Sequence, residues 1–233
     1  MKRKHVIGEK IYSKKQIEYV TNKVNLLGTN YKHNPIELLN IRLISSIFIF
    51  FMLLYFLDFG YLYAPVITFL FYNLFFKITL DPKIKKRQEI LEKDALYFFK
   101  VFVLSLEAGR NIKTAIEITT NNIDSELSVE FKKLLKDVNF GKNLNEALDD
   151  IRKRIPSDSI NNIILSIKES NIFGNNIVNN IYSGIEYIKD KKVLESKAKI
   201  SKIPVKISVV SVIFFIPLLL LLILGPMLIE FLS

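Results

Sequence analysis

The sequence contains no cysteine and no tryptophan, and its only histidines are His5 and His33. Without cysteine the chain has no disulfide and no thiolate metal ligand, which fits a reducing compartment. Isolated histidines in a basic N-terminal region are far more often surface residues than metal ligands. Glycine-rich phosphate loops, Walker motifs and Gly-x-Ser-x-Gly motifs are absent as well. We therefore expect no enzyme activity, no catalytic residue, no cofactor and no metal site.

Basic residues are missing from two long stretches of the chain. All 33 Lys and Arg residues fall within 1–42 and 77–206, so 43–76 and 207–233 contain none. The second stretch begins with 23 consecutive uncharged residues. A helix needs about 20 such residues to cross a bilayer. We predict a C-terminal transmembrane helix at 206–231.

The first stretch without basic residues, 43–76, is too long for one crossing. As a single helix it would measure about 51 Å, well beyond a hydrocarbon core of about 30 Å. Asp58-Phe59-Gly60 interrupts it near its middle. Two short crossings joined by a tight turn fit better, and we predict a transmembrane hairpin at 42–77. The alternative is a buried hairpin inside a soluble core.

Each predicted membrane segment has Lys and Arg beside one of its ends. These basic ends all fall on the same side of the membrane in the predicted topology. Residues 1–42 hold nine Lys and Arg against three glutamates. Because cytoplasmic flanks are enriched in these cations, we expect a basic cytoplasmic segment at 1–41 and a cytoplasmic helical domain at 78–205. Residues 15–27 carry apolar side chains on one face, which suggests a helix lying on the membrane surface.

The net charge of +10 raises the question of nucleic-acid binding. The distribution argues against it, because the block from 77 to 206 intersperses 24 Lys and Arg with 18 Asp and Glu. This pattern is typical of solvated helix faces, and the excess of basic residues lies beside the predicted membrane segments, where anionic headgroups attract it. The expected partner is the lipid bilayer and not a nucleic acid.

One short sequence motif occurs three times in the middle of the chain. Its glycines lie 32 and 33 residues apart, and each is followed two residues later by asparagine. A glycine in the left-handed conformation ends many helices, and asparagine is a preferred first cap of the next one. Each copy of the motif therefore predicts a helix end followed at once by a helix start, which indicates repeated helical hairpins. The three glycines are Gly109, Gly141 and Gly174.

Apolar periodicity and helix-end residues predict the rest of the domain. Asp81 is the expected N-cap of its first helix, and Pro204 is the expected boundary with the last membrane helix. The fold class is therefore an all-α integral membrane protein with a cytoplasmic antiparallel six-helix bundle and three transmembrane helices. The predicted bundle helices cover 81–106, 112–120, 125–138, 143–155, 158–172 and 176–201.

Five segments of this pattern resemble a known family, the type II secretion system F domain. The resemblance covers about residues 80 to 231, and its last segment with the proline-containing apolar terminus is similar to the Tad-pilus platform branch, the TadB/TadC-like proteins. The segments are LSLEAGRNIKTAI (104–116), FGKNLNEAL (140–148), IRKR (151–154), IFG (172–174) and KIPVK (202–206).

The resemblance implies a platform protein in the cytoplasmic (inner) membrane at the base of a pilus or secretion machine. It implies three kinds of partner: a cytoplasmic secretion ATPase, pilin-like subunits, and a sister platform protein or a second copy of the chain. It carries over no catalytic residue, because the family is not itself an ATPase. Gly109, Gly141 and Gly174 match the family's turn glycines, whose role is to shape the turns.

Charged residues beside these turns are the candidate contacts with a partner, since rigid turns expose charges that steer association. They are Glu107, Arg110, Lys142, Arg152 and Arg154. A solvated surface is the simpler interpretation of any one of them. Two other functions stay open: a membrane-bound enzyme or small transporter, disfavoured by the absence of ionisable groups from the membrane interior, and a membrane-anchored adaptor or sensor unrelated to pili.

Overall fold

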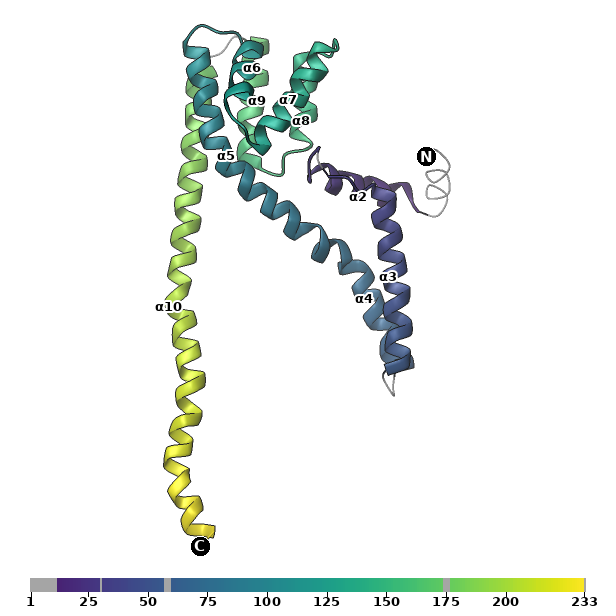
Figure 1. The fold of residues 1–233 in the computed structure, drawn as a ribbon, viewed down its shortest axis with the longest axis vertical. Coiled ribbons are helices and arrows are strands. Elements are labelled where there is room, and N and C mark those ends of the chain that lie inside the picture. The colour runs from purple at the N-terminus through teal and green to yellow at the C-terminus, as the bar shows by residue number, and fades with distance from the viewer. Residues whose placement is uncertain (1–11, 30, 57–59, 174–176, 233) are drawn as a thin grey trace. The chain divides into compact units, whose positions relative to one another are not determined.

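The computed structural model describes residues 12–29, 31–56, 60–173 and 177–232, and within these ranges it contains helices and no strands. The chain divides into two compact units, Met1–Glu186 and Tyr187–Ser233. The first unit holds a membrane hairpin, a short N-terminal helix and a helical domain (Figure 1). The second consists of the remainder of the last helix.

Within the described residues, three helices are long and apolar enough to cross a membrane. The first two pair as the predicted hairpin, α3 (Pro35–Phe56) against α4 (Gly60–Thr79). Large apolar side chains such as Phe48 and Phe69 are exposed on their outer faces, so the described part of the chain does not bury the hairpin in a core of its own, which favours the membrane hairpin. The predicted turn residues 57–59 lie outside the described residues.

Helix α4 runs into α5 (Asp81–Glu107) almost without interruption. Leu80 between them has helical φ and ψ, its N–H bonds to the Phe76 carbonyl, and its own carbonyl accepts from Ile84. The prediction of Asp81 as an N-cap is therefore wrong. Proline is tolerated in the first turn of a helix, so Asp81-Pro82 does not force a break, and the Asp81 carboxylate pairs with Lys23 instead.

The N-terminal helix α2 (Lys14–Asn25) packs across the end of the hairpin. Its Val20 and the following Leu27 are buried in a cluster with residues of α3 and α4 that include Leu39 and Phe76. The amphipathic pattern was correctly interpreted as a helix, but its apolar face is covered by protein. The predicted placement of this helix on the membrane surface stays a prediction.

Helices α5 to α9 form the helical domain, in which consecutive helices contact one another and alternate in direction (Figure 1). Phe98 and Phe99 of α5 stack around Phe131 of α7 at centroid distances of 4.7 and 6.3 Å. Phe98, Phe99 and Phe102 in the second half of α5 thus belong to the core of the domain. The domain helices after α5 are α6 (Ile112–Asn122), α7 (Glu126–Asn139), α8 (Leu144–Arg152) and α9 (Asp158–Phe173).

The last helix, α10, runs from Ile177 to Leu232 through Pro204. Its first turns belong to the first unit, where Gly184 lies so close to Ile163 of α9 that a Cβ there would overlap with it. The prediction of Pro204 as a helix boundary is wrong. An interior proline removes one backbone hydrogen bond, and membrane helices tolerate that loss. The predicted cytoplasmic location of the helical domain stays a prediction.

Candidate functional site

Two turns of the helical domain share one local geometry, and we call residues 108–111 and 140–143 the distal turns. In the first, Gly109 has φ of 77° and the Arg110 N–H bonds back to the Ser105 carbonyl at 3.2 Å. In the second, Gly141 has φ of 97° and the Lys142 N–H bonds to the Asp137 carbonyl at 3.1 Å. These bonds satisfy carbonyls that a helix end leaves free.

An asparagine begins the helix after each distal turn. The side chain of Asn111 accepts from the Thr114 N–H at 2.8 Å, and that of Asn143 accepts from the Asn145 N–H at 2.8 Å. The predicted glycine ends and asparagine starts are thus confirmed at both places, while Gly174 lies outside the described residues. Figure 1 places both turns at the same end of the domain, away from α2.

Two predicted contact residues, Glu107 just before the first distal turn and Arg110 within it, are accessible. Glu107 and Arg110 are both exposed. Glu107 accepts a hydrogen bond of 3.3 Å from the hydroxyl of Tyr182, in the first turns of α10. The Arg110 guanidinium has no ion pair with any residue that the structure describes. A partner can therefore pair with it without displacing any carboxylate that the structure describes.

The charges of the second distal turn are paired within the chain. Lys142 bonds to Asp150 of α8, which also accepts from Lys153 at 2.9 Å. The hydrogen bond from Lys142, with that from Lys153, lowers the pKa of Asp150 to about 2. The same bond raises the pKa of Lys142. Lys142 is half-buried, so it contributes to this surface as part of a neutralised pair.

Arg152 also lies in a paired surface cluster. Its guanidinium is 3.6 Å from Asp149, which in turn accepts from Lys168 of α9 at 2.6 Å. Asp149 and Arg152 line a shallow open depression together with Lys153 and Asn161. Because the charges alternate and neutralise one another, this face is typical of a solvated network, and the Lys168–Asp149 pair joins α8 to α9.

Arg154 is not exposed, although its place in a turn predicted that it would be. Only 13% of its side chain is accessible, and its Nε donates to Glu130 of α7 at 2.7 Å. The residue is turned inward toward a buried polar cluster. The premise that turn charges are exposed therefore fails at this position.

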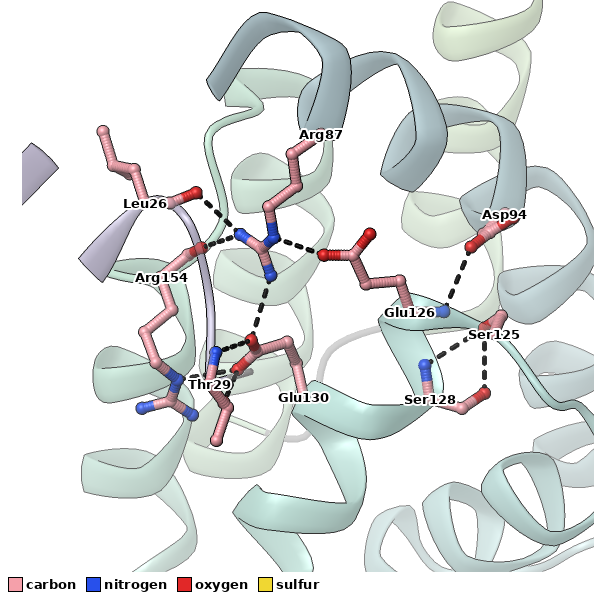
Figure 2. Close-up of polar contacts among 9 residues, drawn as sticks. All are labelled: Leu26, Thr29, Arg87, Asp94, Ser125, Glu126, Ser128, Glu130 and Arg154. Carbon is pink, nitrogen blue, oxygen red and sulfur yellow. Dashed lines mark hydrogen bonds and ion pairs between the residues drawn. The ribbon is translucent and has the colours of Figure 1, made fainter. Parts of the chain in front are cut away.

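That cluster, which we call the hub, consists of Arg87, Glu126, Glu130 and Arg154 (Figure 2). Arg87 of α5 is 6% exposed and donates to Glu126 at 2.5 Å and to Glu130 at 2.9 Å. Its Nη1 donates to the backbone carbonyl of Arg154 at 2.5 Å. The two arginines and two glutamates neutralise each other, which is what burial of charge requires.

The hub also binds the turn after α2. Arg87 Nη1 donates to the Leu26 carbonyl at 2.8 Å. The N–H and the hydroxyl of Thr29 donate to the two oxygens of Glu130, each at 2.9 Å. Burial opposes ionisation of Glu130, but the bonds and charge of Arg154 and the donors of Thr29 outweigh burial. The pKa of Glu130 therefore lies below its ordinary value.

Gly28 allows this close approach. Its φ is 86°, in the region that favours glycine, and a Cβ there would overlap with Nη2 of Arg87. The guanidinium cannot easily withdraw, because four acceptors hold it. Glycine at position 28 is thus required by both the turn and the contact.

The predictions from sequence missed the hub. Arg87 belongs to a basic run that the charge pattern assigned to the membrane flank, and Thr29 carries no local signal. One usable signal was Glu130, which lies on the apolar face of α7 beside Leu127, Phe131 and Leu134. A carboxylate on a buried face implies a buried cationic partner, although the sequence does not say which arginine supplies it.

Comparison with known proteins gives one family. A family model described as "Type II secretion system (T2SS), protein F" matches residues 98–225, which is more than half of the chain. No curated protein and no solved structure gives a match. The matched span includes the distal turns together with Glu126, Glu130 and Arg154 of the hub. It excludes Arg87 and everything that precedes it.

Proposed function

The chain belongs to the type II secretion system protein F family, and from this membership we propose that it is a cytoplasmic-membrane platform protein of a type II secretion, type IV or Tad-type pilus assembly machine. The family consists of platform proteins of secretion and pilus assembly systems. Three candidate membrane spans and an all-helical domain between the second and third fit that role.

The distal turns are the proposed contact with a cytoplasmic secretion ATPase. The observation that carries this proposal is that two turns of like geometry lie at one end of the domain, with exposed Glu107 and Arg110 at the first of them. Each turn is fixed by a positive-φ glycine and an asparagine cap. A charge on such a rigid support loses little conformational entropy on binding, so it suits recognition of a large partner.

The continuous α4–α5 helix is the proposed route from the ATPase contact to the membrane. It extends over 47 residues from Tyr61 to Glu107, about 70 Å at 1.5 Å per residue. One end bears the first distal turn and the other lies in the hairpin. A displacement at the turns therefore moves the hairpin, where pilin-like subunits enter or leave the membrane.

The Tad-type branch is the finer proposal. It rests on the resemblance of residues 202–206 and the proline-containing apolar terminus to TadB/TadC-like proteins, and on the single matched span. A single F domain fits action together with a sister platform protein or a second copy of the chain.

The test is a pull-down of the tagged full chain from membranes crosslinked in vivo, with charge-reversal variants. We expect recovery of a secretion ATPase and a pilin from the parent chain and loss of the ATPase in Arg110→Glu. The matched control is Lys132→Glu, because Lys132 is an exposed cation on α7 outside the distal turns. Capture of neither partner by the parent chain would instead favour the membrane-anchored adaptor or sensor.

A further inference from the structure

Residues 12–29, which the family match does not cover, lie between the membrane hairpin and the helical domain. Their connection to the hairpin is mostly apolar. Val20 and Leu27 are buried against Leu39 and Phe76, and the hydroxyl of Tyr12 donates to Asn40 of α3 at 2.9 Å. This segment is thus fixed to the hairpin through its own packed core.

The same segment is fixed to the helical domain through the hub. Leu26 offers its carbonyl to Arg87, and Thr29 offers two donors to Glu130 (Figure 2). All three bonds have a charged partner, and such bonds contribute more than neutral ones. The segment is also joined to the start of α5 by the ion pair of Lys23 with Asp81.

Separation of this turn from the hub would leave charged groups incompletely bonded. Glu130 has a side chain that is 2% exposed and would lose two of its four donors. Arg87 would lose one of its four acceptors. Groups buried to this extent are costly to leave unsatisfied, so separation of the turn from the hub costs free energy.

We propose that residues 12–29 are a brace, a second and non-covalent connection between the membrane hairpin and the helical domain beside the α4–α5 helix. One helix fixes the separation of its ends but leaves their relative direction to bending and rotation. A second attachment at the hub fixes that direction. The brace rests on contacts within the first unit and is independent of the proposed partners.

The test uses the absence of cysteine from the chain, which allows labelling without background. Spin labels at Ile44→Cys in α3 and Lys132→Cys in α7, both exposed positions, report the separation of hairpin and helical domain in lipid nanodiscs. The brace predicts one narrow distance distribution for the parent chain. It predicts that this narrow peak is lost in Gly28→Ala, which drives a Cβ into the Arg87 guanidinium.

Gly109→Ala is the matched control. Gly109 has a similar positive φ, but a Cβ there meets no atom within 4 Å, so the variant carries the same backbone penalty without touching the hub. It should keep the narrow peak. A second label pair inside the helical domain, Lys113→Cys with Lys132→Cys, should stay narrow in Gly28→Ala.

Three results would overturn the brace. The parent chain could give a broad distribution, Gly28→Ala could keep the parent distribution, or both label pairs could broaden in Gly28→Ala. The last result would mean that the turn stabilises the fold of the helical domain and does not set the direction of the domain relative to the hairpin.

Discussion

At the scale of single residues, Glu130 is a buried carboxylate of the helical domain that depends on several hydrogen-bond donors. Its carboxylate is nearly inaccessible and accepts from Arg87, Arg154 and two donors of Thr29. The residues that surround it come from three separate parts of the chain. Its energetic effect therefore reaches beyond its own helix.

Removal of the Glu130 carboxylate should strongly lower the free energy of unfolding. Glu130→Ala leaves Arg87 and Arg154 buried with too little negative charge, and breaking a buried pair costs about 3–5 kcal/mol. Chemical unfolding of the purified chain in detergent would measure the loss. The control is Glu89→Ala, an exposed position of α5, where a surface substitution changes the free energy of unfolding by about 0.5 kcal/mol or less. Equal losses would contradict the assignment of the hub as a stabilising cluster.

The hub should also make stability depend on pH. The pKa of Glu130 is lower in the folded chain than its ordinary value, so its contribution to stability is present above the ordinary glutamate pKa of about 4.3. That contribution is lost as pH falls through the lower folded pKa. Unfolding measured between neutral and strongly acidic pH should show a smaller acid-induced loss for Glu130→Gln than for the parent chain. Parallel curves would show that Glu130 ionisation does not support the fold.

At the scale of elements, caps and glycines could be predicted and the joints between helices could not. Asn111, Ser125 and Asn143 each accept a backbone N–H from the turn they begin, because capping depends on neighbours in sequence. Asp81 and Pro204 are also residue types that commonly stand at helix boundaries, but here both lie within continuous helix. At those two positions the neighbouring helical turns and the surrounding packing keep the backbone helical. The hub needs contacts across up to 101 positions, which no local pattern reports.

The second distal turn gives a prediction at this scale. Gly141→Ala forces a left-handed conformation on a residue with a Cβ, which costs about 1–2 kcal/mol. Gly141→Asn should lose less, because asparagine visits that conformation more readily. Thermal unfolding of the two variants beside the parent chain would measure the difference. Since nothing lies within 4 Å of a Cβ at Gly141, equal losses would mean that conformation does not determine the requirement for glycine.

At the scale of the whole molecule, the family match accounts for the helical domain after residue 97 and for most of α10. The sequence already indicated three membrane segments and the helices between them, because hydropathy and periodicity are strong signals over long windows. No sequence pattern indicated the attachment of residues 12–29 to the helical domain. That attachment depends on Gly28 and Thr29 meeting Arg87 and Glu130 in space.

The predicted orientation is testable across the membrane with single cysteines in intact cells. Lys32→Cys and Arg110→Cys, in the predicted cytoplasmic parts, should resist a membrane-impermeant maleimide until the cells are opened. Asp58→Cys, in the predicted outer turn, should react without opening. The positive-inside distribution of Lys and Arg is the physical reason for this expectation. Labelling of Arg110→Cys in intact cells would reverse the topology and separate the distal turns from any cytoplasmic ATPase.

The most direct measurement is site-specific photo-crosslinking in living cells from positions at the distal turns. A photoreactive amino acid at Arg110 should form an adduct with a secretion ATPase, since Arg110 is exposed beside a rigid turn. The same amino acid at Lys132, exposed on α7 outside the distal turns, should not. Adducts with the ATPase from Arg110 alone are the result that the platform role predicts. Equal adducts from both positions, or none from Arg110, would contradict it.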